Sequence, residues 1–384
     1  MSSARIEPAR PLIAGRFHIE REVGRGGIGT VHRAYDVQTE RHVALKIITA
    51  LGVDAEGQAR LSREGQILSE LDHPGIVRVV AFGTVDSTTT DAEGRRIEEG
   101  TTFIAMEWLD GEDLASRQRR SPLSLREGLE VGRQVASALA TAHDAGVVHR
   151  DIKPSNILLL RGPPDAGIRV KLVDFGVAAS KEVVLTTDAG SPVGTPAYIS
   201  PEQARGDATV DARSDLYSLG ATLFELVAGR PPHMGPTSIA TLVRLATTPA
   251  PRLSEFLLDV VPALDELIHA LLLADRGLRP SSAREVADRL AALVAEPHLP
   301  TPSPLRVSDN PPGVMGTRLV TTIVALHVAT GEERHRELEA LRRRGADALP
   351  LGADSIVAHL GVRQAHGDEA SRALELGLGL GDRG

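Results

Sequence analysis

The spacing of hydrophobic residues changes character along the chain. Residues 16 to 48 alternate apolar and polar positions around a glycine cluster, which predicts antiparallel strands. Residues 56 to 71 switch to helical spacing. Two further apolar runs, 76 to 82 and 102 to 108, enclose a polar stretch, 86 to 100, which we expect to be an exposed hairpin. This part of the chain therefore predicts a sheet with one accompanying helix.

Beyond Asp110 the apolar residues recur mostly at helical intervals. A long helix is expected from Leu125, with Gly146 as its left-handed C-terminal stop, and another from Ser214 to Gly229. Three shorter amphipathic helices are expected at 236–247, 263–274 and 282–295.

Composition divides the chain further, because six prolines crowd between Pro297 and Pro312 and predict a semi-extended linker. Past it we expect strands at 319–328 and 355–360 and helices at 332–344 and 368–376. The predicted parts are a tail (1–15), a small sheet-rich lobe (16–108), a larger helical lobe (109–296), the linker (297–316) and a partial α/β domain (317–384), for which truncated and complete stay open as alternatives.

Charge and cysteine content narrow the class of protein. The 384 residues carry 51 acidic and 43 basic side chains without a long run of either sign, which argues against nucleic-acid binding or a polybasic membrane anchor. There is no cysteine, which excludes disulfides and fits a reducing cytoplasm. No signal-peptide core and no run of about 18 apolar residues occur, so we expect a cytoplasmic chain without a membrane segment.

Four short motifs follow one another in a fixed order. They are Gly24-Arg-Gly-Gly-Ile-Gly29, Val43-Ala-Leu-Lys46, His149-Arg-Asp-Ile-Lys-Pro-Ser-Asn156 and Asp174-Phe-Gly176. Each is common alone, but together they form the protein-kinase signature. From Arg16 to about Glu296 the chain resembles a eukaryotic-type serine/threonine protein kinase of the bacterial kind. The resemblance implies an α+β, bilobal protein-kinase fold, with a short α/β segment after it.

The glycines allow a loop between two strands to fold closely over phosphate, because residues without Cβ bring backbone amides near the oxygens. A plain turn is the alternative for the motif alone. A dinucleotide site needs a helix after Gly29, whereas Thr30 to Ala34 has the pattern of a strand. By resemblance, the ATP-binding residues are Val23, Gly24, Arg25, Gly26, Gly27, Ile28, Gly29, Val31, Ala44, Lys46, Met106, Glu107 and Leu109.

Lys46 and Glu64 are predicted to form an ion pair. A lone lysine at a strand end is usually a solvated charge, but Glu64 lies inside the apolar stripe of its helix, where an unpaired carboxylate is costly. The resemblance implies that Lys46 then holds the α- and β-phosphates of ATP. The neighbouring Gly65 weakens the helix by ~1 kcal/mol relative to alanine, which predicts that the helix is easily displaced.

The third motif presents its polar groups from a loop, because Pro154 prevents a continuing helix. An ordinary salt-bridged loop is the alternative for this segment alone. The resemblance implies that Asp151 accepts the proton of a substrate hydroxyl and that Lys153 neutralises the transferring phosphoryl group. It also implies that Asn156 and Asp174 share a Mg²⁺ ion, with Mn²⁺ as a substitute.

The stretch from Gly176 to Glu202 resembles an activation segment. Its hydroxyl residues are Thr186, Thr187, Ser191 and Thr195. Thr195 is expected to position the substrate, and the other three are expected phosphosites whose phosphate pairs with Arg150. A solvated polar loop is the alternative. Glu202 and Arg279 resemble the pair that pins this segment, and Asp215 either braces the catalytic loop or simply favours a first helical turn.

Two hypotheses of function follow. The first is an active kinase that phosphorylates serine or threonine in proteins and self-associates for trans-autophosphorylation. The second is a nucleotide-binding pseudokinase that acts as a scaffold, which usually lacks one of Lys46, Asp151 or Asp174; this chain has all three. The segment 317–384 resembles the start of a class III nucleotide-cyclase-like domain, but its first strand, Val320 to His327, lacks the metal-binding aspartate, so we expect no catalysis there.

Overall fold

The computed structural model describes residues 12–26, 29–49, 65–163, 166–175, 196–207, 210–235, 237–304, 321–325, 332–343, 347–351 and 355–360. The chain forms two compact units, and each is described by itself. Unit 1 contains residues 1–123, 129–180 and 283–291, and unit 2 contains residues 124–128, 181–282 and 292–384.

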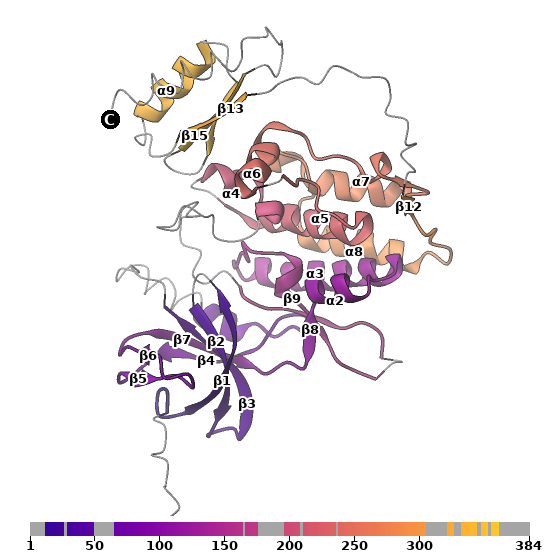
Figure 1. The fold of residues 1–384 in the computed structure, drawn as a ribbon. Coiled ribbons are helices and arrows are strands. Elements are labelled where there is room, and N and C mark those ends of the chain that lie inside the picture. Colours follow the sequence, from indigo (N-terminus) through magenta and orange to yellow (C-terminus); the bar gives the residue numbers. More distant parts are fainter. Residues whose placement is uncertain are drawn as a thin grey trace, which may run out of the picture. The chain divides into compact units, whose positions relative to one another are not determined.

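Unit 1 is built on a five-stranded antiparallel sheet (Figure 1). Its strands are β1 (Phe17–Gly26), β2 (Gly29–Asp36), β3 (Arg41–Ile48), β4 (Val79–Thr84) and β7 (Thr102–Glu107), in the order β1-β2-β3-β7-β4. Alternate residues of the strands, such as Leu45 and Ile47, fill a core with Phe17 and Phe103. The alternation in the sequence therefore predicted the strands correctly, because one face of each strand is buried.

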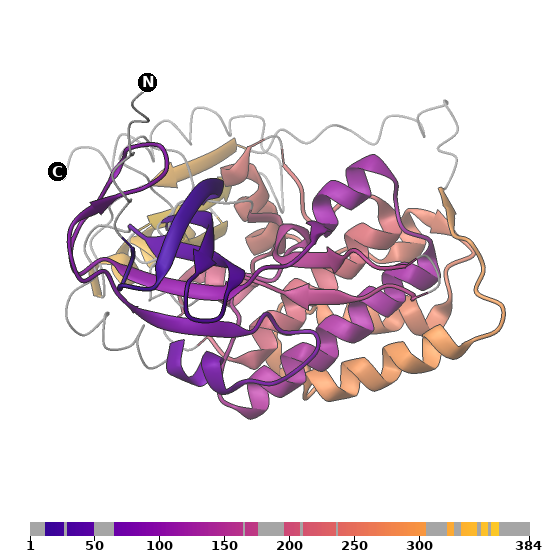
Figure 2. The ribbon, with the colours of Figure 1, turned by 90° about the horizontal axis from the view of Figure 1, so that it is seen from below.

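The polar stretch 86–100 does form a hairpin, with strands β5 (Thr89–Thr90) and β6 (Arg96–Ile97), beside the sheet (Figures 1 and 2). The prediction that it is exposed was wrong in part. Asp91 and Ile97 are each only 5% exposed. Ile97 joins the apolar core of the sheet, and Asp91 accepts hydrogen bonds from the backbone of Glu93 and Arg95. Burial is tolerated because the carboxylate is satisfied.

The rest of unit 1 carries the third and fourth motifs. A three-stranded sheet consists of β8 (Gly111–Asp113), β9 (Ile157–Leu160) and β10 (Val170–Leu172). Helix α2 (Leu114–Arg120) is capped by Asp113, and α3 (Leu125–Asp144), whose first residues belong to unit 2, is followed by Gly146 at φ 77°. The predicted helix at 56–71 is described only at 65–70, where it is helical.

Unit 2 is mainly helical. Its helices are α4 (Pro201–Arg205), α5 (Ala212–Ala228), α6 (Ser238–Thr247) and α7 (Pro262–Leu271), and α8 (Ala283–Ala295) runs from unit 1 into it. Helix α5 begins two residues before the predicted Ser214, because the Asp211 side chain accepts from the Arg213 amide at 2.9 Å and caps the helix. Gly229 ends it in the left-handed conformation at φ 72°, as expected.

Two small sheets complete unit 2. Strand β11 (Leu257–Leu258) pairs with β12 (Ser303–Pro304), inside the stretch predicted as linker. The C-terminal segment contains β13 (Thr321–Ala325), α9 (Glu332–Arg343), β14 (Asp347–Leu351) and β15 (Ser355–Leu360), with antiparallel order β13-β15-β14. Strand β14 was not predicted, and the helix predicted at 368–376 lies outside the described residues. Within the described ranges, no helix has the length and hydrophobicity that a membrane span requires.

Candidate active site

Three side chains of the predicted catalytic loop are hydrogen-bonded to one another. Asp151 Oδ2 accepts from Lys153 Nζ at 2.8 Å and from Asn156 Nδ2 at 2.9 Å. Asn156 Nδ2 also donates to the Asp151 carbonyl oxygen at 2.7 Å. A 3-10 turn, Pro154–Asn156, brings the asparagine back to the aspartate. The Asp151 carboxylate is therefore held in one orientation, and its 44% exposure leaves it accessible.

Asp174 lies close to this loop because β9 and β10 form a hairpin. The Val173 amide donates to the Asn156 carbonyl oxygen at 3.0 Å. His149 Nε2 lies 3.0 Å from the Val173 carbonyl oxygen, and the His149 ring packs on Phe175 at 4.5 Å between centroids. His149 therefore orients the backbone on either side of Asp174.

Lys46 contacts the same aspartate. Lys46 Nζ donates to Asp174 Oδ1 at 2.9 Å, and the lysine side chain is 16% exposed. The predicted partner, Glu64, lies outside the described residues, so the Lys46–Glu64 pair stays a prediction. Asp174 has φ 58°, which few residues other than glycine adopt, so its backbone is held there by the structure around it.

A cavity of about 170 Å³ opens beside Asp174. Its lining includes, among the predicted ATP-binding residues, Val31, Ala44, Met106, Glu107 and Leu109. Apolar side chains dominate, which suits a flat aromatic base. The Glu107 amide already donates to the Arg78 carbonyl oxygen at 3.0 Å. Of the two backbone groups of Glu107, the carbonyl is therefore the one expected to form a hydrogen bond with a nucleotide base. Six predicted ATP-binding residues that the structure describes do not border the cavity, namely Val23, Gly24, Arg25, Gly26, Gly29 and Lys46. Val23 is 40% exposed, and Arg25 pairs with Glu22 at 2.8 Å.

Sequence reasoning missed four lining residues, Val77, Trp108, Leu158 and Val173. The last three could have been predicted from their position in the sequence, since each lies within two positions of a predicted site residue. Val77 carried no such signal. It reaches the cavity because its amide donates to the Leu172 carbonyl oxygen at 3.0 Å, a contact between distant parts of the chain.

Lys171 was also missed. Its Nζ donates to Glu107 Oε1 at 2.7 Å and to the Ile76 carbonyl oxygen at 2.8 Å. The same Glu107 oxygen accepts from the Arg78 amide at 2.8 Å. Lys171 therefore ties β10 to the end of β7, where the cavity wall begins.

The glycines of the first motif differ in what they contact. A Cβ on Gly29 would lie 2.0 Å from the Ile47 carbonyl oxygen, so packing between β2 and β3 alone requires glycine there. A Cβ on Gly24 or Gly26 would meet no described atom within 4 Å. Packing among the described residues therefore does not require glycine at these two positions. Gly27 and Ile28 lie outside the described residues.

The site suits a hard divalent cation. Asp174 supplies carboxylate oxygens, and Asn156 donates from its amide nitrogen to Asp151, which makes its amide oxygen the candidate metal ligand. These are the oxygen ligands that Mg²⁺ prefers. The backbone bond between Val173 and Asn156 keeps the two candidate ligands together.

Glu202 and Arg279 form a buried ion pair in unit 2. Arg279 donates to both carboxylate oxygens at 2.7 and 2.8 Å, and the two side chains are 1% and 0% exposed. Burial opposes ionisation of Glu202, but hydrogen bonds and the charge of Arg279 outweigh it and lower the pKa of Glu202 to about 2. Ser214 donates to the same carboxylate at 2.6 Å. The pair fixes the start of α4 to the end of the 3-10 turn Arg276–Leu278.

Arg150 and Asp215 are the other residues predicted to support the site. Arg150 has φ 66°, and Asp215 is fully buried in the first turn of α5. The predicted activation-segment residues Thr186, Thr187, Ser191 and Thr195 lie outside the described residues.

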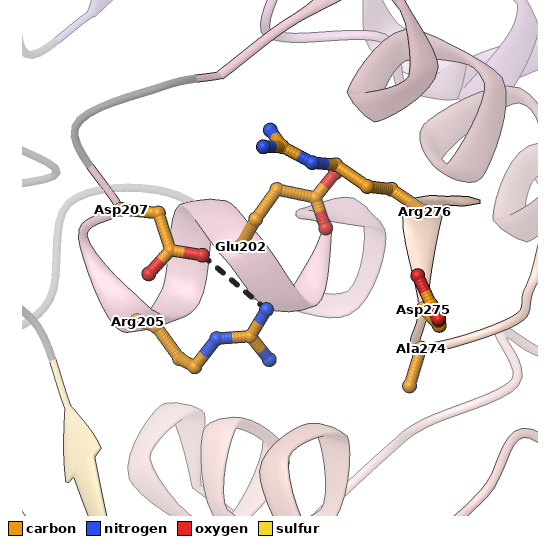
Figure 3. Close-up of a pocket in the computed structure, with 6 residues that line it drawn as sticks. All are labelled: Glu202, Arg205, Asp207, Ala274, Asp275 and Arg276. Carbon is orange, nitrogen blue, oxygen red and sulfur yellow. Dashed lines mark hydrogen bonds and ion pairs between the residues drawn. The ribbon is translucent and has the colours of Figure 1, made fainter.

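A second cavity, of about 420 Å³, lies in unit 2 between α4 and the segment 274–276 (Figure 3). Arg205, Asp207, Asp275 and Arg276 line it together with Glu202 and Ala274. Arg205 pairs with Asp207 at 3.3 Å. Its wall carries both cations and carboxylates, which gives the cavity no single charge preference.

Known proteins resemble this chain over most of its length. The Mycobacterium tuberculosis serine/threonine-protein kinase PknA is 36% identical over 303 residues, which is 78% of this chain and 65% of PknA. The Myxococcus xanthus serine/threonine-protein kinase pkn2 is 35% identical over 299 residues, 75% of this chain and 33% of pkn2. The chain thus spans about two thirds or less of the length of these relatives.

A solved structure shares the fold. The crystal structure of Rad53 1-466 in complex with AMP-PNP matches with a TM-score of 0.55 and 25% identity, over 72% of this chain and 65% of that chain. The family model described as protein kinase domain matches residues 17–290. The sheet of unit 1, the helices of unit 2 and these matches agree, and the chain belongs to the protein kinase family.

Proposed function

We propose that the chain is a serine/threonine protein kinase that transfers the γ-phosphoryl group of ATP to protein serine and threonine hydroxyls. The observation that carries the proposal is the bonded set Asp151, Lys153 and Asn156, held by one hairpin to Asp174 and, through it, to Lys46. The named relatives are serine/threonine-protein kinases, and Rad53 was solved with AMP-PNP, which supports ATP as the donor.

Asp151 is the proton acceptor in this proposal. As the substrate oxygen forms its bond to the γ-phosphorus and the bond from that phosphorus to the bridging oxygen of ADP breaks, the hydroxyl proton passes to the Asp151 carboxylate. Lys153, already 2.8 Å from Asp151, places its positive charge where negative charge spreads over the phosphoryl oxygens. Lys46 holds the non-transferred phosphates, for which it exchanges its contact with Asp174.

Asn156 and Asp174 are the residues that would hold Mg²⁺, or Mn²⁺ as a substitute. When bound, the ion supplies positive charge that offsets the phosphate oxygens. The backbone link between the two residues keeps their side chains in place before the ion arrives.

Control of activity is assigned to the activation segment. Phosphate on Thr186, Thr187 or Ser191 would pair with Arg150, and Thr195 would position the substrate. Self-association would let one molecule phosphorylate another. Replacement of the three phosphosites by alanine lowers the rate if this control exists, and an unchanged rate in the triple variant refutes it.

The segment 317–384 is given no catalytic role. Its likeness to a nucleotide-cyclase-like domain stays a hypothesis, because the first strand lacks the metal-binding aspartate. Its three-stranded sheet is antiparallel throughout.

Phosphate transfer from radiolabelled ATP to a protein substrate tests the proposal. We expect Asp151→Asn to lower the rate by at least about 100-fold, because the proton acceptor is lost. Asp144→Asn, an exposed control in the same unit, should leave the rate unchanged. Equal incorporation by Asp151→Asn and the unaltered chain would remove the enzyme claim and favour a pseudokinase.

A further inference from the structure

A group of metal-ligand types lies on the sheet of unit 1, away from the catalytic residues. One ring nitrogen of His32 and one carboxylate oxygen each of Asp91 and Glu93 lie within 4.8 Å of one another. His32 belongs to β2, and the two acids belong to the hairpin 86–100. His32 and Asp91 are 0% and 5% exposed, and Glu93 is exposed. This is not a chance grouping of surface acids, because two of its three members are buried.

His32 has a ring nitrogen without a partner. Nε2 lies 2.8 Å from Thr30 Oγ1, whereas Nδ1 is buried and has no hydrogen-bond partner among the described residues. A proton on Nδ1 would be an unsatisfied buried donor, so the favoured tautomer donates from Nε2 to Thr30 and leaves a lone pair on Nδ1. A buried lone pair without a donor is unusual, and a metal ion would satisfy it.

The cluster sits on the opposite face of β2 from the nucleotide cavity. Alternation in β2 puts Val31, which lines that cavity, on one face and His32 on the other. The group therefore shares no ligand with Asn156 and Asp174.

A closed network of ion pairs is the competing explanation. Arg95 contacts the carboxylates of Glu22, Asp91 and Glu93. One guanidinium thus faces three carboxylates, and among the described residues the only other cation that pairs with them is Arg25, which contacts Glu22. Within the part of the chain that the structure describes, Asp91 Oδ2 accepts one hydrogen bond, from Arg95 Nε at 2.7 Å, so one of its lone pairs remains. The network leaves both negative charge and the Nδ1 lone pair unmatched.

We propose that His32, Asp91 and Glu93 form a site for a first-row divalent transition metal, with Zn²⁺ as the best fit. Imidazole with carboxylate favours Zn²⁺ over Mg²⁺, which prefers oxygen alone. Bonds of about 2.0–2.2 Å place tetrahedral ligand atoms about 3.4 Å apart, so a modest inward rotation of the exposed Glu93 completes the site. Water or Glu22, which pairs with His32 in the strand register, takes the fourth position.

The ion would join the hairpin to the strand that carries the nucleotide loop. Strand β2 begins at Gly29 and contains Thr30 and Val31 just before His32. A metal at His32 therefore restrains β2 from the side remote from nucleotide, and it acts as a structural clamp rather than as part of the transfer reaction.

Calorimetric titration of the full chain with Zn²⁺ tests the site. The Asp174→Asn background removes the expected catalytic metal site, and Mg²⁺ serves as the comparison ion. We expect one Zn²⁺ per chain and no binding of Mg²⁺ here. Glu93→Gln, which changes the exposed ligand, should weaken Zn²⁺ binding at least about 10-fold. Glu98→Gln, on the same hairpin but outside the cluster, is the matched control and should bind as the parent does.

A second readout covers the buried ligand. Co²⁺ in place of Zn²⁺ gives visible d–d absorption that changes when a ligand is lost, and His32→Gln should abolish the spectrum in protein that circular dichroism shows to be folded. The proposal is overturned if the parent binds no Zn²⁺, or if Glu93→Gln and Glu98→Gln bind it equally.

Discussion

At the scale of single residues, the glycines of the first motif serve different purposes. We predict that Gly29→Ala lowers the free energy of unfolding by ~1–3 kcal/mol, because its Cβ would displace the Ile47 carbonyl oxygen. Gly24→Ala and Gly26→Ala meet no described atom, so they should change stability by less than ~0.5 kcal/mol while raising the KM for ATP. Urea unfolding and steady-state kinetics on the three variants measure both effects.

If Gly24→Ala or Gly26→Ala were clearly less stable than the parent, these glycines would also be needed for packing, which would contradict the prediction. So would a Gly29→Ala variant as stable as the parent.

The buried pair Glu202–Arg279 makes stability depend on pH. The pKa of Glu202 is lowered from 4.5 to about 2, so its stabilising effect is complete above about 4.5 and is lost as the pH falls toward 2. We predict that Glu202→Gln costs ~3–5 kcal/mol at pH 7, since Arg279 stays buried without its counter-charge. The difference between variant and parent should shrink as the pH falls from 5 to 3, as measured by urea unfolding.

An exposed ion pair provides the control. Asp144 pairs with Arg284 at 2.7 Å with both side chains more than 60% exposed, at 69% and 67%. Asp144→Asn should cost less than ~1 kcal/mol at pH 7. If the difference in free energy of unfolding between Glu202→Gln and the parent stayed constant from pH 7 to 3, ionisation of Glu202 would not be the source of the stability.

Residues close in sequence were easier to bring together than distant ones. Asp151, Lys153 and Asn156 lie within six positions, and Pro154, which prevents a continuing helix, was enough to predict that one loop presents all three. Their mutual hydrogen bonds were not predicted. Lys46 and Asp174 are 128 positions apart, and their observed contact depends on the whole of unit 1. The pair of Lys46 with Glu64, predicted from a local apolar stripe, stays a prediction. The contact of Lys46 with Asp174 was not predicted, because it joins residues at the ends of two strands far apart in the sequence.

At the scale of elements, Gly65 has a packing role that its helix propensity conceals. A Cβ on Gly65 would lie 2.6 Å from the ring of Phe82, which belongs to β4. We predict that Gly65→Ala does not stabilise the protein, because a clash of ~1–3 kcal/mol outweighs the gain of ~1 kcal/mol in helix propensity. Thermal unfolding of the full chain measures the sign.

Removal of the ring should reverse that sign. In a Phe82→Ala background, Gly65→Ala should raise stability by ~1 kcal/mol, because only the propensity term remains. Stabilisation of the same size in both backgrounds would mean that the ring and the glycine do not interact.

Two further elements show what the pattern of polar and apolar residues could not predict. The hairpin 86–100 is polar in sequence, yet Ile97 and Asp91 are buried, because the hairpin packs on the sheet and Asp91 is satisfied by local amides. Strand β14 contains Pro350, which argues against a central strand. It is at the edge of its sheet, where a missing amide costs little, and only the strand order reveals that.

At the scale of the whole molecule, the kinase fold was the strongest prediction because it depended on four motifs at once. The sheet followed by helices came from periodicity, and the order of the motifs selected one family among the folds with that pattern. The end of this fold was harder to locate, since proline content predicted a linker from residue 297 while pairing continues beyond that point.

Contacts past α8 predict where the chain can be cut. The family match ends at residue 290, but Arg126 donates to the Glu296 carbonyl oxygen at 2.6 Å, and Ser303–Pro304 pairs with Leu257–Leu258. We predict that a chain ended after Pro304 keeps its phosphotransfer rate within about twofold. A chain ended after Ala295 should lose ~1–2 kcal/mol and a few degrees of Tm, because these hydrogen bonds are absent. Thermal unfolding and the transfer assay on both truncations measure this. Loss of activity in the longer truncation would mean that the C-terminal segment takes part in phosphate transfer.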